Sequence, residues 1–238
     1  MSANGTGGTD PYGRDRIRRA LLHFLSGKAL SSALGIINLI ALIRLLSAED
    51  FGLYASLLSI QVVFLAVSSF GIESTMERYL PEVRLKAGPA GVLPFLLRCL
   101  ALRIVALLSC AALLLAGLHL LLPHLGLADH AALVGTYAWV IVAVALMNSG
   151  GAALEALLHQ RAAQLCAIVY ALTRSAFIGW GSFHGQFDMR TVVVMDLTAS
   201  LAAFGVAVVA LAPYLRHPTA PVHARTEAPA LWARFRAF

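Results

Sequence analysis

Six apolar runs, each close to twenty residues long, leave this chain few possible folds. A helix needs about 20 consecutive apolar residues to cross ~30 Å of bilayer hydrocarbon. In that medium the backbone must satisfy its own hydrogen bonds, which excludes open sheets and lipid-exposed loops. We expect the spans at 27–46, 51–71, 94–122 (charge-free only from 104), 133–154, 162–181 and 191–213.

The composition supports a membrane location. Hydrophobic residues make up 59% of the 238 positions and charged residues 13%, whereas soluble domains average about 45–50% apolar and about 25% charged residues. A soluble chain of this length could not bury so much apolar surface. The sequence therefore predicts an all-α integral membrane protein, a bundle of six transmembrane helices.

Three segments organise the chain. Residues 1–26 form a cytosolic leader and a basic amphipathic lead-in, RDRIRRALLHFL, which we expect to lie along the membrane surface. Residues 27–213 form the bundle, and residues 214–238 a cytosolic basic linker. A tight turn at 47–50 joins the first two spans. A longer polar segment, ESTMERYLPEVRLKAGP, joins the second and third, and Pro81 and Pro89 are expected to interrupt it.

The distribution of Lys and Arg predicts the orientation. Of the 18 Lys and Arg residues, four lie inside the apolar runs: Arg44, Arg98, Arg103 and Arg174. Arg190 is the only one in the loops of one side of the membrane, and all the others fall on the opposite side. Cytosolic loops carry the excess of Lys and Arg, so both termini are expected to be cytosolic. The expected location is the inner (plasma) membrane. Arg98 and Arg103 should then reach back to the surface. An aromatic belt is expected at the outer boundary, made of Tyr54, Tyr137, Trp139 and Trp180.

No enzyme signature is present. The sequence has no GxxxxGK[ST], GxSxG, HExxH or GxGxxG. His124 and Asp129 have an acyltransferase-like spacing, but they lie in a short loop without phosphate-binding residues. Cys99, Cys110 and Cys166 form no CxxC pair, so we expect packing roles rather than a metal site. We predict no enzyme activity, no cofactor and no nucleic-acid partner.

Polar residues inside the spans are the candidate site. Such residues are costly in lipid and face a bundle interior or a cavity, although hydrogen-bonding residues also join helices. For Arg174 and Asp196 a polar cavity is favoured. At ~1.5 Å per residue they lie about 12 Å and about 9 Å below the outer ends of consecutive spans, so we predict a pair. The tentative cavity residues are Arg44, Arg174, Asp196, Asn38, Gln61 and Asn148.

Two blocks around the second span resemble a known family. IRLLSAEDFGLYASL and then FGIESTMERYLPEVR are similar to lipid-linked oligosaccharide flippases of polysaccharide biosynthesis, in the multidrug/oligosaccharidyl-lipid/polysaccharide exporter superfamily. Elsewhere the likeness is in helix lengths and loop placement. The matching residues are Arg44, Leu46, Ser47, Asp50, Phe51, Gly52, Tyr54, Phe70, Gly71, Arg78, Tyr79, Pro81 and Glu82.

The same residues also have structural interpretations, which we favour over direct substrate contact. The Ser47–Asp50 turn offers an N-cap for the second helix, with its acidic residues near the positive end of the dipole. Gly52 would permit close approach of another helix. Gly71 and Pro81 would shape the exit from the second span.

The resemblance implies transport by alternating access between two bundles of about six helices. This chain would be one half, acting on a polyprenyl-linked glycan within membrane lipid. Its end, APALWARFRAF, resembles the lead-in to a seventh helix, so we expect a truncated or split reading frame, or a half-size protein that pairs with itself or a second half. A small-molecule exporter of the same superfamily and a non-transporting scaffold among glycan-assembly proteins remain alternatives.

Overall fold

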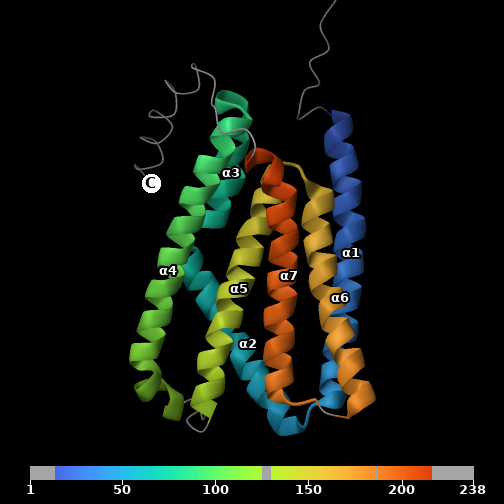
Figure 1. Cartoon of the computed structure of the whole chain (residues 1–238), viewed down its shortest axis with the longest axis vertical. Helices are drawn as coiled ribbons and strands as arrows, with labels where there is room; N and C mark the ends of the chain where they lie inside the picture. The colour runs from blue at the N-terminus through green and yellow to red at the C-terminus, as the bar shows by residue number, and fades with distance from the viewer. Residues whose placement is uncertain (1–13, 125–129, 186, 216–238) are drawn as a thin grey trace, which may run out of the picture.

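The bundle consists of long helices (Figure 1). The computed structural model describes residues 14–124, 130–185 and 187–215. All regular elements in these ranges are helices, and each of them except α3 contains a stretch long and apolar enough to cross a membrane. The predicted all-α bundle with six spans is confirmed. The helices are α1 (Arg14–Leu45), α2 (Ala48–Ser69), α3 (Ile72–Ala87), α4 (Pro89–His124), α5 (Ala131–Ala156), α6 (Gln160–His184) and α7 (Met189–Leu215).

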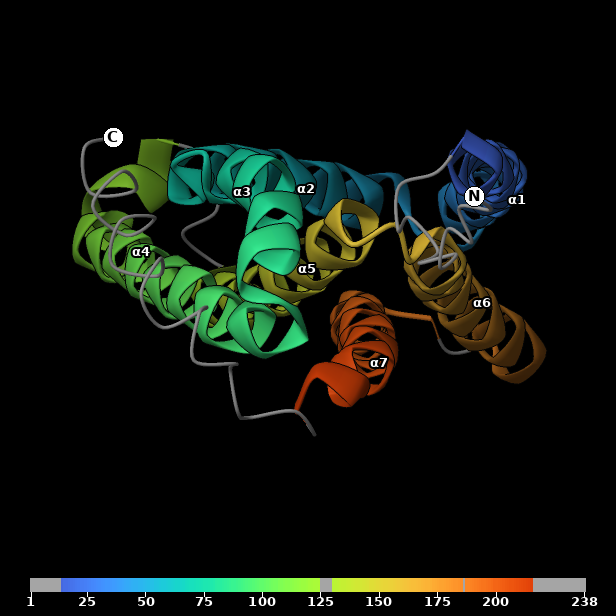
Figure 2. The same cartoon turned by 90° about the horizontal axis from the view of Figure 1, so that it is seen from above.

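The spanning helices run alternately up and down. α1 begins and α7 ends at the same end of the bundle, while the α1–α2 and α6–α7 connections lie at the other end (Figure 1). Seen from above, α1 lies beside α6, and α7 lies between α6 and α5 (Figure 2). α3 packs on α4 and α5. This arrangement brings α2, α5, α6 and α7 around one interior.

Side-chain caps and left-handed residues set where the helices begin and end. The Ser47 hydroxyl accepts a hydrogen bond from the Asp50 backbone N–H, at 3.1 Å, so the predicted N-cap of α2 is confirmed. Phe70 and Gly71 have positive φ angles of 41° and 71°, so the helical backbone is interrupted between α2 and α3. Gly71 therefore does shape the exit from the second span.

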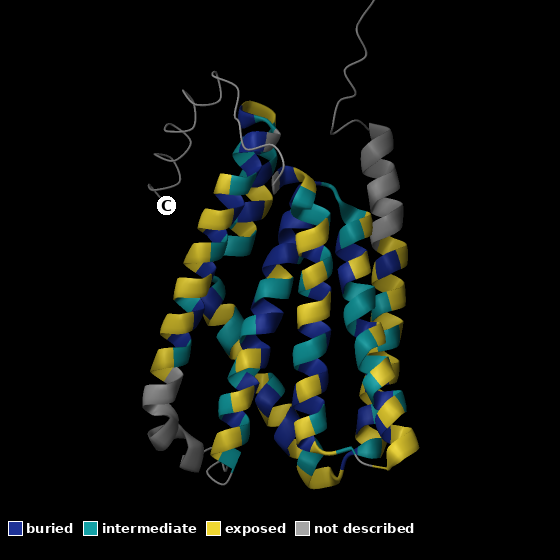
Figure 3. Ribbon diagram, viewed as in Figure 1, coloured by how far each residue is buried: buried dark blue, intermediate teal, exposed yellow. Residues whose placement is uncertain are grey.

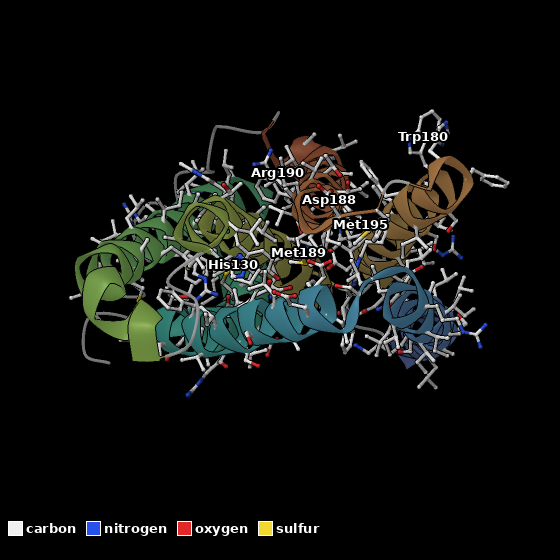
Figure 4. The ribbon with its side chains drawn as sticks, turned by 90° about the horizontal axis from the view of Figure 1, so that it is seen from below. His130, Trp180, Asp188, Met189, Arg190 and Met195 are labelled. Atoms are coloured by element: carbon white, nitrogen blue, oxygen red, sulfur yellow. The ribbon has the colours of Figure 1, made fainter. Side chains whose placement is uncertain are left out.

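Asp188 caps the start of α7. Its carboxylate accepts hydrogen bonds from the Thr191 backbone N–H, at 2.9 Å, and from the Thr191 hydroxyl, at 2.7 Å. These bonds favour the ionised form and hold the pKa of Asp188 below its usual value. Asp188 lies with Met189 and Arg190 at the lower end of the bundle (Figure 4).

The polar segment after the second span is a helix, α3, and not an interrupted connection. Met76, Leu80, Val83 and Ala87 are buried on one of its faces, at the three- and four-residue spacing of an amphipathic helix. Pro81 lies inside the helix without ending it. The polar composition hid this element because only one face is apolar.

The ends of two predicted segments also differ. The basic lead-in from Arg14 is continuous with the first span in one helix, α1, and is not a separate surface helix. α4 begins at Pro89, so the apolar part of the third span, Ala90–Leu113, includes Arg98 and Arg103. Asp129 and the basic linker from 216 onward lie outside the described residues.

Burial separates an interior from a lipid-facing exterior. Buried positions gather on α5 and on the inner sides of its neighbours, while exposed positions follow the outer sides of α4 and α7 (Figure 3). The largest core cluster joins α2, α5 and α7 through buried side chains such as Leu57, Val140 and Val192. Gly52 is exposed, and no atom of the described residues lies within 4 Å of a Cβ added there, so the close helix approach predicted at Gly52 is absent from the described part of the bundle.

Only part of the predicted aromatic belt faces outward. Trp139 and Trp180 are 66% and 67% exposed, and Trp180 points away from the bundle on the outer side of α6 (Figure 4). Tyr54 and Tyr137, in contrast, are 2% and 1% exposed. The prediction was wrong for these two tyrosines because the rotation of α2 and α5 turns them into the core, where their hydroxyls hydrogen-bond.

Candidate functional site

A buried cluster of polar side chains lies where α2, α6 and α7 meet. Arg174 of α6 and Asp196 of α7 form an ion pair, with Nε and Oδ1 3.0 Å apart. Tyr54 of α2 bridges the two, because its hydroxyl accepts a hydrogen bond from Arg174 Nη2 at 2.7 Å and donates one to Asp196 Oδ2 at 3.2 Å. The predicted pairing of Arg174 with Asp196 is thereby confirmed.

Tyr54 provides the hydrogen bonds that connect the two charged side chains. Although Arg174 Nε and Asp196 Oδ1 are close, they are not aligned for a hydrogen bond. The hydrogen bonding of the cluster therefore passes through the Tyr54 hydroxyl. Arg174 also lies over the ring of Tyr170, with its guanidinium carbon 5.6 Å from the ring centre, a cation–π contact.

Burial makes the two charges depend on each other. Asp196 is almost fully enclosed, and the Arg174 side chain is only 15% exposed. An isolated ionised side chain at such a depth would be strongly unfavourable. The two side chains neutralise each other, and the tyrosine satisfies further hydrogen-bonding capacity.

Two of the other predicted residues join helices beside this cluster. Asn38 of α1 donates to the carbonyl of Ala171, at 2.9 Å, and accepts from the Ser175 hydroxyl, at 2.8 Å. Gln61 of α2 accepts a hydrogen bond from the Tyr137 hydroxyl of α5, at 2.8 Å. Both contacts have the character of interhelical hydrogen bonds, one of the two interpretations held open for these residues.

Arg44 and Asn148 are not brought into the cluster. Both are exposed on this bundle, and the contacts of Arg174, Asp196 and Tyr54 include neither of them. They could border a cavity only if a second protein surface faced them.

The motif residues behind the family resemblance have mixed surroundings. Tyr54 belongs to the cluster, Phe51 packs against the largest core cluster, and Asp50 takes part in the cap of α2. At the far end of the motif, Arg78 lies over the ring of Tyr79 at 5.3 Å. Glu82 forms an ion pair with Lys86 at 2.7 Å, one turn further along α3.

The sequence analysis placed Tyr54 in the family motif and in the aromatic belt but not among the cavity residues, although a signal for the cavity exists. Tyr54 and Gln61 are seven residues apart in α2 and therefore share one face of the helix. Leu57 lies between them on that face and is fully buried. Polar side chains repeated at this spacing indicate an interior face.

A second ion pair, in which the arginine is buried, was also missed. Arg103 is 1% exposed and does not reach the surface as predicted. Its Nη2 lies 3.2 Å from Glu73 Oε1 of α3, which also accepts from the Ser149 hydroxyl of α5 at 3.3 Å. Arg103 was misplaced because α4 begins earlier than expected and α3 packs against it.

Comparisons with known proteins identify no relative of this chain. No protein-family model matches it, and neither a curated protein nor a solved structure does so.

Proposed function

We propose that this protein is one bundle of a lipid-linked oligosaccharide flippase that exports precursors of surface polysaccharide. The observation that carries the proposal is the buried Tyr54–Arg174–Asp196 cluster inside a six-span bundle. Ionisable residues within membrane spans mark substrate or ion pathways more often than they serve packing alone. Tyr54 also belongs to the sequence block that resembles such flippases.

The chemistry of the cluster suits a hydroxyl-rich headgroup. Arg174 supplies several fixed N–H donors, Asp196 is an acceptor, and the Tyr54 hydroxyl can do both. Sugar hydroxyls can replace these hydrogen-bonding groups one at a time, so that neither buried charged side chain is left without a polar partner. A conformational change that opens the cluster would expose a polar surface to the substrate, and this is transport by alternating access rather than bond chemistry.

The exposed polar residues support a second bundle. Arg44 and Asn148 lie in spanning helices and face outward, whereas polar groups in spans ordinarily face protein or water. A second copy, or a different chain of the same architecture, would cover these residues and complete a cavity.

A small-molecule exporter of the same superfamily is the second candidate. The observation that favours it is the depth of Asp196, since a buried carboxylate can bind a cationic solute or a coupling proton. Against it, Arg174 already neutralises this carboxylate in the cluster.

Complementation tests the proposal. Expressed alone in a bacterial strain without its own flippase, the chain is expected to leave lipid-linked precursor on the cytosolic side, because a sugar crossing beside a single bundle would meet lipid. Desolvating each hydroxyl there costs on the order of several kcal/mol. Co-expression with a second bundle of the superfamily as a separate chain should restore export, measured as precursor accessible from outside.

Two variants make this test specific. In the restored pair, Asp196→Ala should abolish export and Gly151→Leu, away from the cluster, should retain it. Restoration by the chain alone, with no dimer on cross-linking, would contradict the two-bundle arrangement. Export of a cationic dye but not of precursor would favour the small-molecule exporter, and complex formation without any transport would favour the scaffold.

The orientation is tested separately by reporter fusions. We propose that both termini are cytosolic, because the loops at that end carry all but one of the Lys and Arg residues that lie outside the apolar runs. The proposed export of surface polysaccharide precursors would place the protein in the inner (plasma) membrane. Fusions after Leu25, Ala90, Gln160 and Arg225 should be active only with a cytosolic reporter, and fusions at Asp50, Leu127 and Gln186 only with an external one. A cytosolic signal at Asp50 or Gln186 would refute the orientation.

A further inference from the structure

An apolar groove runs between α4 and α7 and has α5 as its floor. It encloses about 170 Å³. α4 contributes four leucines, from Leu93 to Leu100, and α7 contributes Phe204, Val208 and Leu211. Gly150 and Ala153 of α5 keep the floor low because their side chains are absent or small.

The two walls are regular apolar stripes. Phe204, Val208 and Leu211 recur at the four- and three-residue spacing that puts them on one side of α7. The leucines follow the same spacing on α4. Both stripes lie within the spans Ala90–Leu113 and Met189–Tyr214, so the medium beside the groove is bilayer hydrocarbon.

The groove has the size and polarity for a hydrocarbon chain. An engineered apolar cavity of about 150 Å³ stays dry and accepts benzene, whereas a buried water needs two to four polar partners. The walls offer few such partners, because the hydroxyl of Ser149 is already directed to Glu73. A segment of an alkyl chain fits this space better than water does.

One end of the groove is polar and includes an arginine. Tyr214 closes that end, and its hydroxyl lies 3.0 Å from His159 Nε2. The guanidinium of Arg84 lies 6.0 Å from the centre of the Tyr214 ring, and its Nη1 donates to the carbonyl of Leu157 at 2.9 Å. The guanidinium is thus held at the mouth, where its charge and N–H fork suit a phosphate.

We propose that this groove binds an anionic phospholipid, with one acyl chain along the leucine and Phe204 stripes and its phosphate beside Arg84. The groove supplies the apolar contact and Arg84 the headgroup selectivity. This site lies apart from the Tyr54–Arg174–Asp196 cluster, and the proposal does not depend on what the protein transports.

Quenching by brominated lipids tests the site. The three native tryptophans are replaced by phenylalanine, and single tryptophans are placed by Phe204→Trp or Leu97→Trp, one on each wall. The purified full chain is reconstituted in phosphatidylcholine vesicles that contain a small, equal fraction of brominated phosphatidylglycerol or brominated phosphatidylcholine. Val209→Trp, on the lipid-facing side of α7 where Val209 is 73% exposed, is the matched control.

We expect both groove reporters to be quenched preferentially by the anionic lipid. One cation near the membrane surface contributes about 1 kcal/mol of attraction, which corresponds to an about fivefold relative affinity for phosphatidylglycerol. The Val209→Trp reporter should follow the bulk lipid composition with only a weak preference.

Charge variants at Arg84 separate the headgroup effect from the groove. At the groove reporters, Arg84→Gln should reduce the ratio of quenching by phosphatidylglycerol to quenching by phosphatidylcholine to about one. Arg84→Lys should retain most of this preference, and melting profiles verify that both variants fold. Equal quenching by the two lipids at the groove, or a preference unchanged in Arg84→Gln, would overturn the proposal. Absence of quenching by either lipid would also overturn it, because the groove would then be covered by protein, either the 216–238 segment or a second copy.

Discussion

Asp196→Ala is expected to destabilise the bundle by about 3–5 kcal/mol, the cost of leaving a buried charge without its partner. Removing the carboxylate leaves Arg174, whose side chain is only 15% exposed, without a counter-charge in the interior. The measurement is thermal unfolding and monodispersity of the purified chain in detergent.

Three further variants define the source of this loss. Tyr54→Phe removes only a hydroxyl and should cost about 1 kcal/mol. Replacement of both Arg174 and Asp196 by leucine should cost less than either single replacement, since no buried charge remains. Exchanging the two residues, Arg174→Asp with Asp196→Arg, should restore part of the stability. If Asp196→Ala cost no more than Tyr54→Phe, the ion pair would have no special energetic role.

Gly150→Leu is the second substitution with a large expected effect. Gly150 lies where α5 meets α7, and a Cβ there would come 2.9 Å from the Cβ of Ala207. A leucine must push the two helices apart, and overpacking of this kind costs about 1–3 kcal/mol. Small residues permit the close approach of membrane helices, so the loss should also weaken the α5–α7 contact on which the core depends.

The neighbouring glycine provides a matched control. Gly151 has no atom within 4 Å of an added Cβ, so Gly151→Leu should leave the melting temperature unchanged or raise it through better helix propensity. Within the contact, Gly150→Ala should be destabilising and Ala207→Gly should compensate for it. Equal effects of Gly150→Leu and Gly151→Leu on melting would show that the α5–α7 packing is looser than described.

The sequence was sufficient for the number and the approximate positions of the spans. Lipid imposes a fixed thickness and no water, so length and hydrophobicity alone locate a spanning helix. The Arg174–Asp196 pair was predictable for a related reason. An α-helix rises by a fixed distance per residue, so positions in consecutive helices can be converted into depths in the membrane. The cap at Ser47 could also be read locally, since it involves only residues three apart.

Only the tertiary structure decided which way each helix faces. In a membrane both sides of a span are apolar, so the periodicity that separates inside from outside in a soluble helix is weak. The sequence therefore assigned Tyr54 and Tyr137 to the right helices but turned them toward the belt instead of the core. Rotation about the helix axis is fixed by packing between helices, and this is what brought Tyr54 to Arg174 and Asp196.

The position of Arg103 shows the same dependence on packing. A lone arginine near the start of an apolar run predicts a side chain that reaches the surface. α3, which the polar composition concealed, instead brings Glu73 against α4 and gives the buried Arg103 an acidic partner. The sequence thus determined what must cross the membrane, because that is a property of each segment alone. The ion pair of Arg103 and the bridging role of Tyr54 required the tertiary structure, because each depends on a partner far away along the chain.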